Sequence, residues 1–549
     1  MDLIGLLQKK SIKNNAGHDA AFIDYNGARL SHADILKRST HLAESLESYG
    51  LSNGAVCALI CFNHINFILY FMACLKTRVV PVIINPKYGV EELQSIISAS
   101  EVKTIITDNI YAFDGIIAID GAEVNVINPE IKKSSVACPA VDTDAKSFSC
   151  DNSRSALQDR VCALYGDALN DGTLFMLITS ASGGRPKIVK KSGAALSYQA
   201  EKLYPRILSG LETRYFTNVP PSHSYGLEFA VFASIYNGVP LFIRDFNFSS
   251  DALEEISLNS ITHIFSVPPF LLNLVNYKNS SGTGFDSLEM AVSAGMPLLP
   301  GLAAKFHDAF HFNIASVYGI TEAGCVSFND AGKYSLHQER VSVNNDVGGP
   351  LDGNEIFVLD DSGAALPASN ANIEKTLIEG DSDPLRANIG RIVLRKKNSD
   401  GGYYKLCDAA AAAKWRLGFR ELETDDSGYI DSRGALHLLT RSSAFINIGG
   451  AKINAVDIET FLRSTQLFKD VIVFGQKDDY MGEKITAAIV VGDDFKLSGE
   501  QVRSLCSEKL PLIKVPRDIY ILRQPFPRTA TGKIRFDKVI EIIKSSAVS

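Results

Sequence analysis

Short apolar runs rich in β-branched residues alternate with segments of helical period along most of this chain. In the first part, EELQSIISAS (91–100) carries apolar residues at helical spacing between two such runs. The runs are AVCALICF (55–62), RVVPVIIN (78–85), VKTIITD (102–108), LFMLITS (174–180), RYFTNVP (214–220), PLFIRD (240–245), HIFSVPP (263–269), LEMAVSAG (288–295) and NIASVYG (313–319). This alternation predicts an α/β fold with mostly parallel sheets covered by helices.

The pattern changes near residue 345 to short strands separated by turns rich in Gly and Asp. The strands are predicted in NEIFVLDDSGAAL (354–366), GRIVLRK (390–396), GGYYK (401–405) and SGYIDSRGALHLLTR (427–441). We therefore expect a β-rich subdomain over about 345–440, within an N-terminal domain of residues 1–440. The remaining residues, about a hundred, are enough for a small separate α+β domain.

Composition excludes several classes of protein. A chain of 549 residues predicts more than one domain, and a net charge of −7 gives no reason to expect a nucleic-acid partner. Nine cysteines without CxxC pairs indicate reduced thiols, and the early lysines of MDLIGLLQKKSIKNN argue against a secretory signal. We expect a cytoplasmic protein.

The most apolar stretch is VCALICFNHINFILYFMACL (56–75), which has the length of a membrane span. Asn63, His64 and Asn66 interrupt it. The stretch therefore predicts a buried strand, a polar turn and a buried helix, and we expect no membrane span.

One loop has the composition of a phosphate-binding site. In LITSASGGRPKIVKKS (177–192), small and hydroxyl residues follow an apolar strand and Lys187 follows them. Such a loop brings backbone N–H groups close to an anion, although the Walker ending GK[ST] is absent. Taken alone, an exposed turn explains the stretch equally well.

Two further motifs favour a phosphate-binding site over an exposed turn. In SVYGITEAG (316–324), Tyr318 can stack on a base, Thr321 can bind a phosphate and Glu322 can hold Mg²⁺. Near the end, PRTATGKIR (527–535) places Lys533 after a glycine. The ordinary alternatives are a strand exit and a basic surface loop.

These motifs, and the order in which they follow one another, resemble those of the ANL superfamily of adenylate-forming enzymes. The superfamily contains acyl- and aryl-CoA synthetases, stand-alone and peptide-synthetase adenylation domains, and luciferases. The resemblance covers nearly the whole chain and also includes FMACLKTRVVPVIINPKY (71–88) and VSAGMPL (292–298). It implies a large adenylating domain and a small C-terminal lid over 445–549, which rotates about a hinge at 441–444. It further implies ATP and Mg²⁺ as cofactors.

The resemblance assigns roles residue by residue. Glu322 would coordinate Mg²⁺, Thr321 would contact the α-phosphate, and Lys533 would bridge the carboxylate and the α-phosphate. Ser443 would be the hinge residue, and INIGGAKI (446–453) would line the thiol tunnel. The nucleotide-binding residues would be Thr179, Ser180, Ala181, Ser182, Gly183, Gly184, Lys187, Ser293, Ala294, Gly295, Tyr318, Gly319, Asp426 and Arg441.

NVPPSHSYGLEFAVF (218–232) resembles the segment that lines the carboxylic-acid pocket in this superfamily. His223 falls where acyl and aryl relatives carry a histidine, although a structural histidine explains it comparably well. Bulky and apolar residues would leave room for a short acid only. The predicted pocket residues are Tyr225, Glu228, Phe229, Val292, Val317 and Cys325, with Ala294 in the same wall.

The predicted reaction is activation of a small carboxylic acid by ATP as acyl-AMP, followed by transfer to a phosphopantetheine thiol of CoA or of a carrier protein acting in trans. If Glu228 faces the substrate as a counter-charge, a stand-alone glycine- or alanine-type carrier-protein ligase of cell-envelope modification is the alternative. Ala181, Gly183, Asp425 and Thr440 depart from the family pattern. A nucleotide-binding pseudoenzyme is therefore a second alternative.

Overall fold

The architecture was analysed in a computed structural model of the chain. The residues it describes are 22–88, 90–109, 118–119, 122–123, 125–128, 172–179, 187–210, 212–245, 250–295, 298, 301–330, 346–360, 362–368, 389–396, 403–404, 415–416, 421–441, 445–448, 451–478, 482–492, 496, 498–510, 512–528 and 534–546. Within them, no helix has the length and hydropathy needed to cross a membrane.

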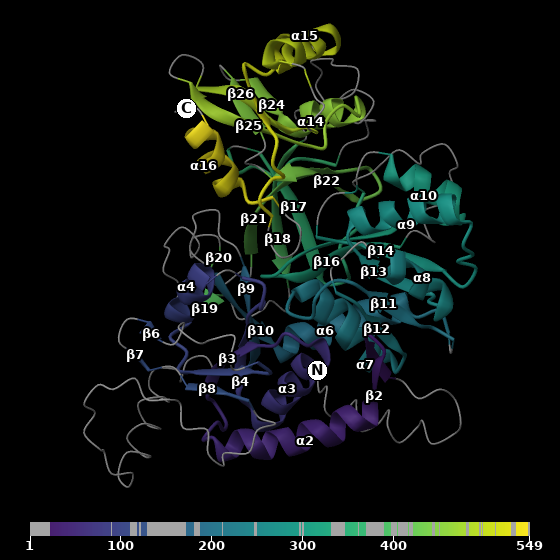
Figure 1. The fold of residues 1–549 in the computed structure, drawn as a ribbon, viewed down its shortest axis with the longest axis vertical. Coiled ribbons are helices and arrows are strands. Elements are labelled where there is room, and N and C mark those ends of the chain that lie inside the picture. Colours follow the sequence, from purple (N-terminus) through teal and green to yellow (C-terminus); the bar gives the residue numbers. More distant parts are fainter. Residues whose placement is uncertain are drawn as a thin grey trace.

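An eight-stranded sheet forms one half of the N-terminal part (Figure 1). Its six inner strands are parallel, in the order β15-β14-β13-β11-β12-β1, while β16 and β2 pair antiparallel at its two edges. The strands are β1 (Phe22–Tyr25), β2 (Ala28–Ser31), β11 (Tyr215–Thr217), β12 (Leu241–Ile243), β13 (His263–Ser266), β14 (Met290–Ser293), β15 (Ala315–Ile320) and β16 (Gly324–Asn329).

A seven-stranded sheet forms the other half, in the order β19-β10-β9-β4-β3-β5-β8. The five strands from β9 to β8 are parallel, and β10 and β19 continue the sheet antiparallel. The strands are β3 (Val56–Ile60), β4 (Val80–Ile83), β5 (Thr104–Thr107), β8 (Asn125–Ile127), β9 (Thr173–Thr179), β10 (Lys187–Ser192) and β19 (Tyr403–Tyr404); β6 (Ala118–Ile119) and β7 (Ala122–Glu123) form a separate pair.

Helices cover both sheets and join them. Helices α8, α9 and α10 pack on the first sheet, α4 packs on the second, and α3 and α7 lie in the core that the two sheets share. In that shared core, the ring of Phe71 lies 5.3 Å from Phe175 and 5.8 Å from Phe232. The helices are α2 (His32–Ser48), α3 (His64–Thr77), α4 (Val90–Ser100), α6 (Gly193–Leu203), α7 (Phe232–Asn237), α8 (Ser250–Leu258), α9 (Pro268–Ser281) and α10 (Leu302–Phe310), with a 3-10 turn at Tyr204–Ile207.

The stretch 56–75 is the predicted strand, polar turn and helix. Asn63 is the N-cap of α3, and its side chain accepts hydrogen bonds from the backbone N–H groups of Ile65 and Asn66. Asp108 accepts from the N–H groups of Phe62 and Asn63 at 2.9 Å each. The polar residues of the sequence therefore satisfy the backbone where strand β3 ends and the buried helix begins.

A third sheet follows, with β17-β18-β21-β20 in line and β22 paired to β21. Its strands are β17 (Asn354–Leu359), β18 (Gly390–Lys396), β20 (Trp415–Arg416), β21 (Glu421–Ile430) and β22 (Leu436–Arg441). The run GGYYK differs from expectation, because Tyr403 and Tyr404 pair with Val189 and Ile188 at the edge of the second sheet. The open edge of β10 provides the hydrogen-bond partners there.

The C-terminal part forms a separate α+β unit at the top of Figure 1, above the third sheet. Its sheet has the order β24-β23-β26-β25, with β27 parallel to β26. Helices α14 and α15 pack with one apolar cluster and α16 with another. The elements are β23 (Phe445–Ile448), β24 (Ala451–Asn454), α14 (Ala455–Ser464), β25 (Asp470–Asp478), β26 (Gly482–Val490), α15 (Gly499–Lys509), a 3-10 turn at Leu512–Lys514, β27 (Asp518–Leu522) and α16 (Phe536–Ser546). The predicted fold class is confirmed.

Candidate active site

The predicted site residues of the N-terminal part follow the carboxyl ends of adjacent parallel strands. Ser266, Ser293 and Ser316 are register partners across β13, β14 and β15. His223 lies in the segment after β11, and Ala294 and Gly295 directly follow β14. Ligands in open α/β sheets bind at this edge, so the topology brings together residues that lie almost a hundred positions apart.

A hydrogen bond links the first sheet to the third at this edge. Tyr318, whose exposure is 4%, donates its hydroxyl to Oδ2 of Asp426 at 2.8 Å. The backbone N–H of Asp426 donates to the Thr424 hydroxyl at 3.2 Å, and that hydroxyl donates to the Ile392 carbonyl. Asp426 is also the register partner of Arg441. The structure therefore brings the predicted base-stacking tyrosine, ribose carboxylate and arginine backbone together.

The YGITE motif forms a tight hairpin turn between β15 and β16. A Cβ on Gly319 would lie 2.4 Å from the Gly324 carbonyl oxygen, and Gly324 has a φ of +65°, so both positions require glycine. The turn closes with a hydrogen bond from the Ala323 N–H to the Ile320 carbonyl. Its two central residues, Thr321 and Glu322, are half-buried. The turn presents a hydroxyl and a carboxylate side by side.

The predicted phosphate loop joins two antiparallel strands. Thr179 ends β9, Lys187 begins β10, and the two are register partners. Ser180, Ala181, Ser182, Gly183 and Gly184 lie outside the described residues, as do Ser443, Lys533 and the side chain of Arg441.

The predicted acid-binding segment contains a seven-residue π-helix, Tyr225–Val231. A Cβ on Gly226 would lie 2.3 Å from the Pro220 carbonyl oxygen, so the segment folds back on itself at a glycine. His223 precedes the π-helix, and its Nε2 lies 3.1 Å from the side-chain amide nitrogen of Asn85. π-Helical turns occur frequently at functional sites.

Most of the predicted pocket wall packs together. Tyr225 packs against Phe229 with ring centroids 5.1 Å apart, and its hydroxyl donates to the Val292 carbonyl at 2.7 Å. Burial raises the pKa of this hydroxyl, which keeps it a donor. The members that share one apolar cluster are Tyr225, Phe229, Val292, Ala294, Val317 and Cys325.

Glu228 is the predicted wall residue that does not belong to this apolar cluster. Its Oε1 lies 3.0 Å from Nζ of Lys191, and the two side chains are 2% and 1% exposed. Sequence reasoning missed Lys191 as a partner. The available signal was its position on β10 two residues after Val189, a fully buried residue, because side chains at i and i+2 share one face of a strand and a buried lysine needs a counter-charge.

The described residues contain no group of three or more His, Cys, Asp or Glu side chains able to enclose a metal. A Mg²⁺ ion that binds with a nucleotide is commonly held by one or two protein carboxylates and by the phosphates of the substrate. Glu322 has the chemistry for that role. The described cysteines Cys57, Cys61, Cys74, Cys325 and Cys506 are free and buried.

The fold and the site define a nucleotide-dependent, adenylate-forming class of enzyme, and the chain belongs to the AMP-binding enzyme family. Its family model matches residues 9–404, and the model of the AMP-binding enzyme C-terminal domain matches residues 457–533. Membership confirms the predicted AMP-forming acid–thiol ligase.

Comparison with known proteins gives relatives over almost the full length. The probable CoA ligase CCL9 of Humulus lupulus is 26% identical over 97% of this chain and 95% of its own, and the oxalate–CoA ligase of Arabidopsis thaliana is 24% identical over 92% of each. Among solved structures, the o-succinylbenzoate CoA synthetase of Bacillus subtilis with its acyl-adenylate intermediate has a TM-score of 0.76 at 21% identity and covers 97% of both chains.

Proposed function

We propose that this enzyme converts a short carboxylic acid and ATP into an acyl-adenylate and pyrophosphate, and then transfers the acyl group to the thiol of CoA. The observation that carries the proposal is the hydrogen bond between Tyr318 and Asp426, with Arg441 opposite Asp426 on the neighbouring strand. This contact joins the YGITE motif to the ribose-binding element predicted from the sequence.

The chain's own groups suit a reaction in which two anions meet. A carboxylate oxygen attacks the α-phosphorus and the bond to pyrophosphate breaks, so cations and hydrogen-bond donors must stabilise charge on the phosphates. Glu322 would hold Mg²⁺, which would supply part of that charge. Thr321, Lys187 and the residues of the 180–186 loop are proposed as phosphate-binding groups, and Lys533 is proposed as the amine that contacts both reacting anions.

The acid is proposed to be short and without an ammonium group. The wall from Tyr225 to Cys325 is filled by bulky and apolar side chains. Glu228 already pairs with Lys191, so its charge is neutralised within the protein. This pairing argues against the amino-acid alternative, which needs Glu228 as the counter-charge. The name of the Arabidopsis relative gives a two-carbon acid and CoA, which supports a small acid and CoA.

A carrier protein in trans is the second acceptor, because it presents the same phosphopantetheine thiol as CoA. We propose that residues 1–440 bind the nucleotide and the acid, that 441–444 act as a hinge at Ser443, and that 445–549 close over the site in a cytoplasmic enzyme.

The test is ATP–pyrophosphate exchange against a panel of short acyl, dicarboxylic, aryl and amino acids, followed by thioester formation with CoA or a phosphopantetheinylated carrier. We expect exchange with at least one short acid and thioester formation with CoA. Exchange with glycine or alanine alone would contradict the proposed acid. Binding of ATP without exchange for any acid would identify a pseudoenzyme.

A further inference from the structure

The Lys191–Glu228 ion pair lies directly beneath the YGITE turn. Lys191 is on β10, four residues after Lys187 and the predicted phosphate loop, and Glu228 is in the π-helix of the acid-binding segment. Both side chains are almost fully enclosed. Removing two charges from water is unfavourable, and apolar replacements of similar volume are often at least as stable. The pair therefore needs an explanation other than stability.

The contacts of the pair supply that explanation. Nζ of Lys191 donates to the Thr321 carbonyl oxygen at 3.1 Å. Oε1 of Glu228 accepts from the Ser224 hydroxyl at 2.8 Å, and the Tyr204 hydroxyl donates to the Glu228 backbone carbonyl. The pair thus connects the strand after the phosphate loop, the acid-binding segment and the YGITE turn.

The contact to Thr321 has a specific geometric consequence. The carbonyl that accepts from Lys191 belongs to the peptide bond between Thr321 and Glu322. A fixed carbonyl fixes the plane of that peptide, which contains the Cα of Glu322, and so restricts the directions in which the Glu322 side chain can leave the backbone.

A second contact holds the other end of the same turn. Oε1 of Gln199 accepts from the backbone N–H of Cys325 at 3.1 Å. A Cβ on Gly324 would lie 2.7 Å from this Gln199 oxygen and 3.4 Å from Oε2 of Glu228. The turn is therefore closely packed on the buried polar groups from both sides.

We propose that Lys191 and Glu228 are positioning residues that hold the Thr321–Glu322 turn in the orientation required to bind the metal–ATP complex. The proposal rests on the proposed roles of Thr321 and Glu322. Lys191 acts through the peptide bond and touches no substrate, and Glu228 holds Lys191 in place through the ion pair. The ion pair thereby couples the acid-binding segment to the phosphate-binding turn.

The experiment compares Lys191→Met/Glu228→Gln with wild type. The double variant removes both charges at once, because a single substitution leaves an unpaired buried charge and can prevent folding. Mn²⁺ replaces Mg²⁺, and electron paramagnetic resonance measures the affinity of Mn²⁺ for the complex of the enzyme with ATP. We expect about 10- to 100-fold weaker Mn²⁺ binding, as is typical when an outer-shell group of a metal site is removed.

The matched control is Arg244→Met/Glu255→Gln. Arg244 is buried and forms ion pairs with Glu255 and with Asp24. In the control variant Asp24 keeps Arg29 as its partner at 2.8 Å. Thermal melts and circular dichroism establish that both double variants fold. We expect the control to bind Mn²⁺ as wild type does.

Mn²⁺ affinity within twofold of wild type in the folded Lys191/Glu228 variant would overturn the proposal, and so would an equal loss in the control. These measurements need no acid substrate. If wild type binds Mn²⁺ and ATP but exchanges pyrophosphate with no acid, the proposed function fails while the ratio of Mn²⁺ affinities still decides the role of Lys191 and Glu228.

Discussion

The side chain of Asn85 determines how the His223 ring is presented. Oδ1 of Asn85 accepts from the backbone N–H of Lys87 at 2.9 Å, so the amide nitrogen of Asn85 faces Nε2 of His223. An amide nitrogen only donates, and Nε2 must therefore accept. This network assigns the proton of a neutral imidazole to Nδ1. Asn85 is 3% exposed, and no motif in the sequence singled it out.

Replacing Asn85 by Ala is expected to remove this control over the ring. If His223 contacts the acid, kcat/KM for the acid should fall about 10- to 100-fold, the usual cost of losing an orienting group, while the KM for ATP stays within about twofold. Pyrophosphate exchange at varied acid and at varied ATP measures both. Asn259→Ala, remote from His223, is the control. An unchanged kcat/KM for the acid would show that His223 is a structural histidine.

The fate of Glu228 shows where inference from sequence ends at this scale. The sequence predicted Tyr225, Glu228 and Phe229 as parts of one pocket wall. It also left open whether Glu228 faces a substrate. A carboxylate in an apolar segment needs a partner, but the partner, Lys191, lies 37 positions away on a strand whose register only the folded sheet defines. Burial was predictable from the pattern, whereas the pairing depended on tertiary structure.

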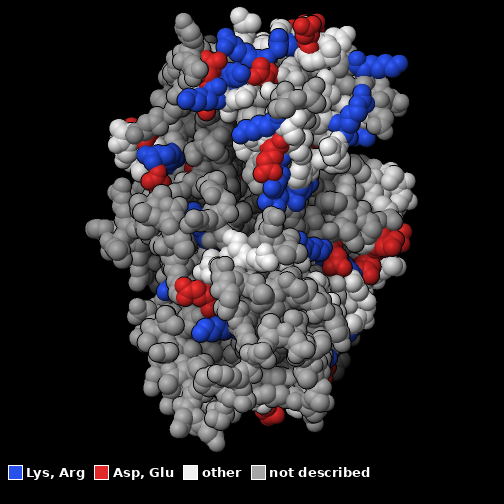
Figure 2. Space-filling view, turned by 60° about the vertical axis from the view of Figure 1, so that its left-hand side comes forward, with Lys and Arg blue, Asp and Glu red and all other residues white. Residues whose placement is uncertain are grey.

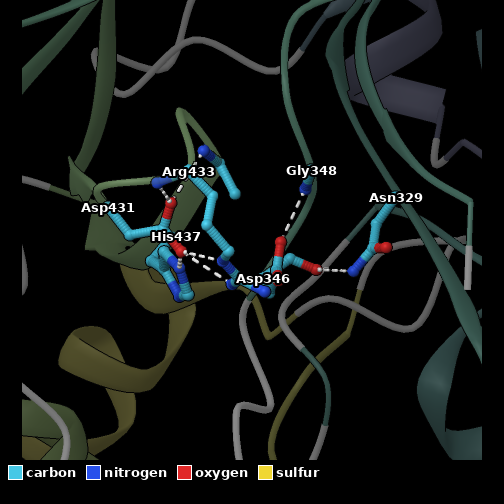
Figure 3. Close-up of polar contacts among 7 residues, drawn as sticks. Asn329, Asp346, Gly348, Asp431, Arg433 and His437 are labelled. Carbon is cyan, nitrogen blue, oxygen red and sulfur yellow. Dashed lines mark hydrogen bonds and ion pairs between the residues drawn. The ribbon is translucent and has the colours of Figure 1, made fainter. Parts of the chain in front are cut away.

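At the scale of elements, the turn between β21 and β22 carries a polar cluster, drawn in Figure 3. Asp431 accepts from Nε2 of His437 at 3.1 Å and from Arg433 at 2.6 Å, and Arg433 also reaches Asp346 at 3.3 Å. Asp346 in turn accepts from the Gly348 N–H at 2.8 Å. The cluster therefore ties the hairpin that carries Asp426 and Arg441 to the segment that precedes β17.

This cluster predicts a dependence of stability on pH. Burial raises the pKa of Asp431, but the Ala435 amide, Arg433 and His437 outweigh burial, and the pKa is lowered overall. A carboxyl whose pKa is lower in the folded state stabilises the fold above its unfolded-state pKa, about 4, and this contribution is lost as pH falls through the folded-state pKa.

The variant Asp431→Asn should therefore be less stable than wild type near pH 7 and should lose less stability between about pH 5 and 3. Thermal melts across that range measure both effects, with the exposed Asp286→Asn as the control. If wild type and Asp431→Asn lose stability in parallel on acidification, the ion pairs of Asp431 do not contribute.

The sequence predicted which segments form strands better than it predicted which strands pair with one another. The β-branched runs from 55 to 319 all contain strands, because burial on both faces of a parallel sheet requires them to be apolar throughout. The π-helix at 225–231 was not predicted, since its apolar spacing resembles that of an α-helix. The sequence also predicted Tyr403–Tyr404 as part of the third sheet, whereas these two residues pair with β10 at the edge of the second sheet.

At the scale of the molecule, the C-terminal unit lies above the third sheet, which carries Asp426 and Arg441 (Figure 1). Figure 2 shows the surface hollowed below this unit, with Lys and Arg side chains gathered on the upper part of the visible face. The two apolar clusters of this unit contain only residues of the unit itself, which supports the proposal that it moves as a body. Such movement would let one unit serve both the adenylation step and the transfer to a thiol, and would exclude water from the acyl-adenylate between them.

The sharpest test of that arrangement is Lys533→Ala. Lys533 lies outside the described residues, and it is the last residue matched by the model of the C-terminal domain. If it delivers a positive charge to the two anions that meet in the first step, its loss should slow adenylate formation about 100-fold or more. Thioester formation from a supplied acyl-adenylate involves no such meeting of anions and should remain within about threefold of wild type. Pyrophosphate exchange measures the first step, and release of AMP from the supplied acyl-adenylate in the presence of CoA measures the second.

Lys538→Ala is the matched control, because Lys538 belongs to the same unit and pairs with Glu541 on α16 at 2.9 Å. Equal loss in both steps would indicate damage to the whole C-terminal unit, and exchange at the wild-type rate would remove Lys533 from the site.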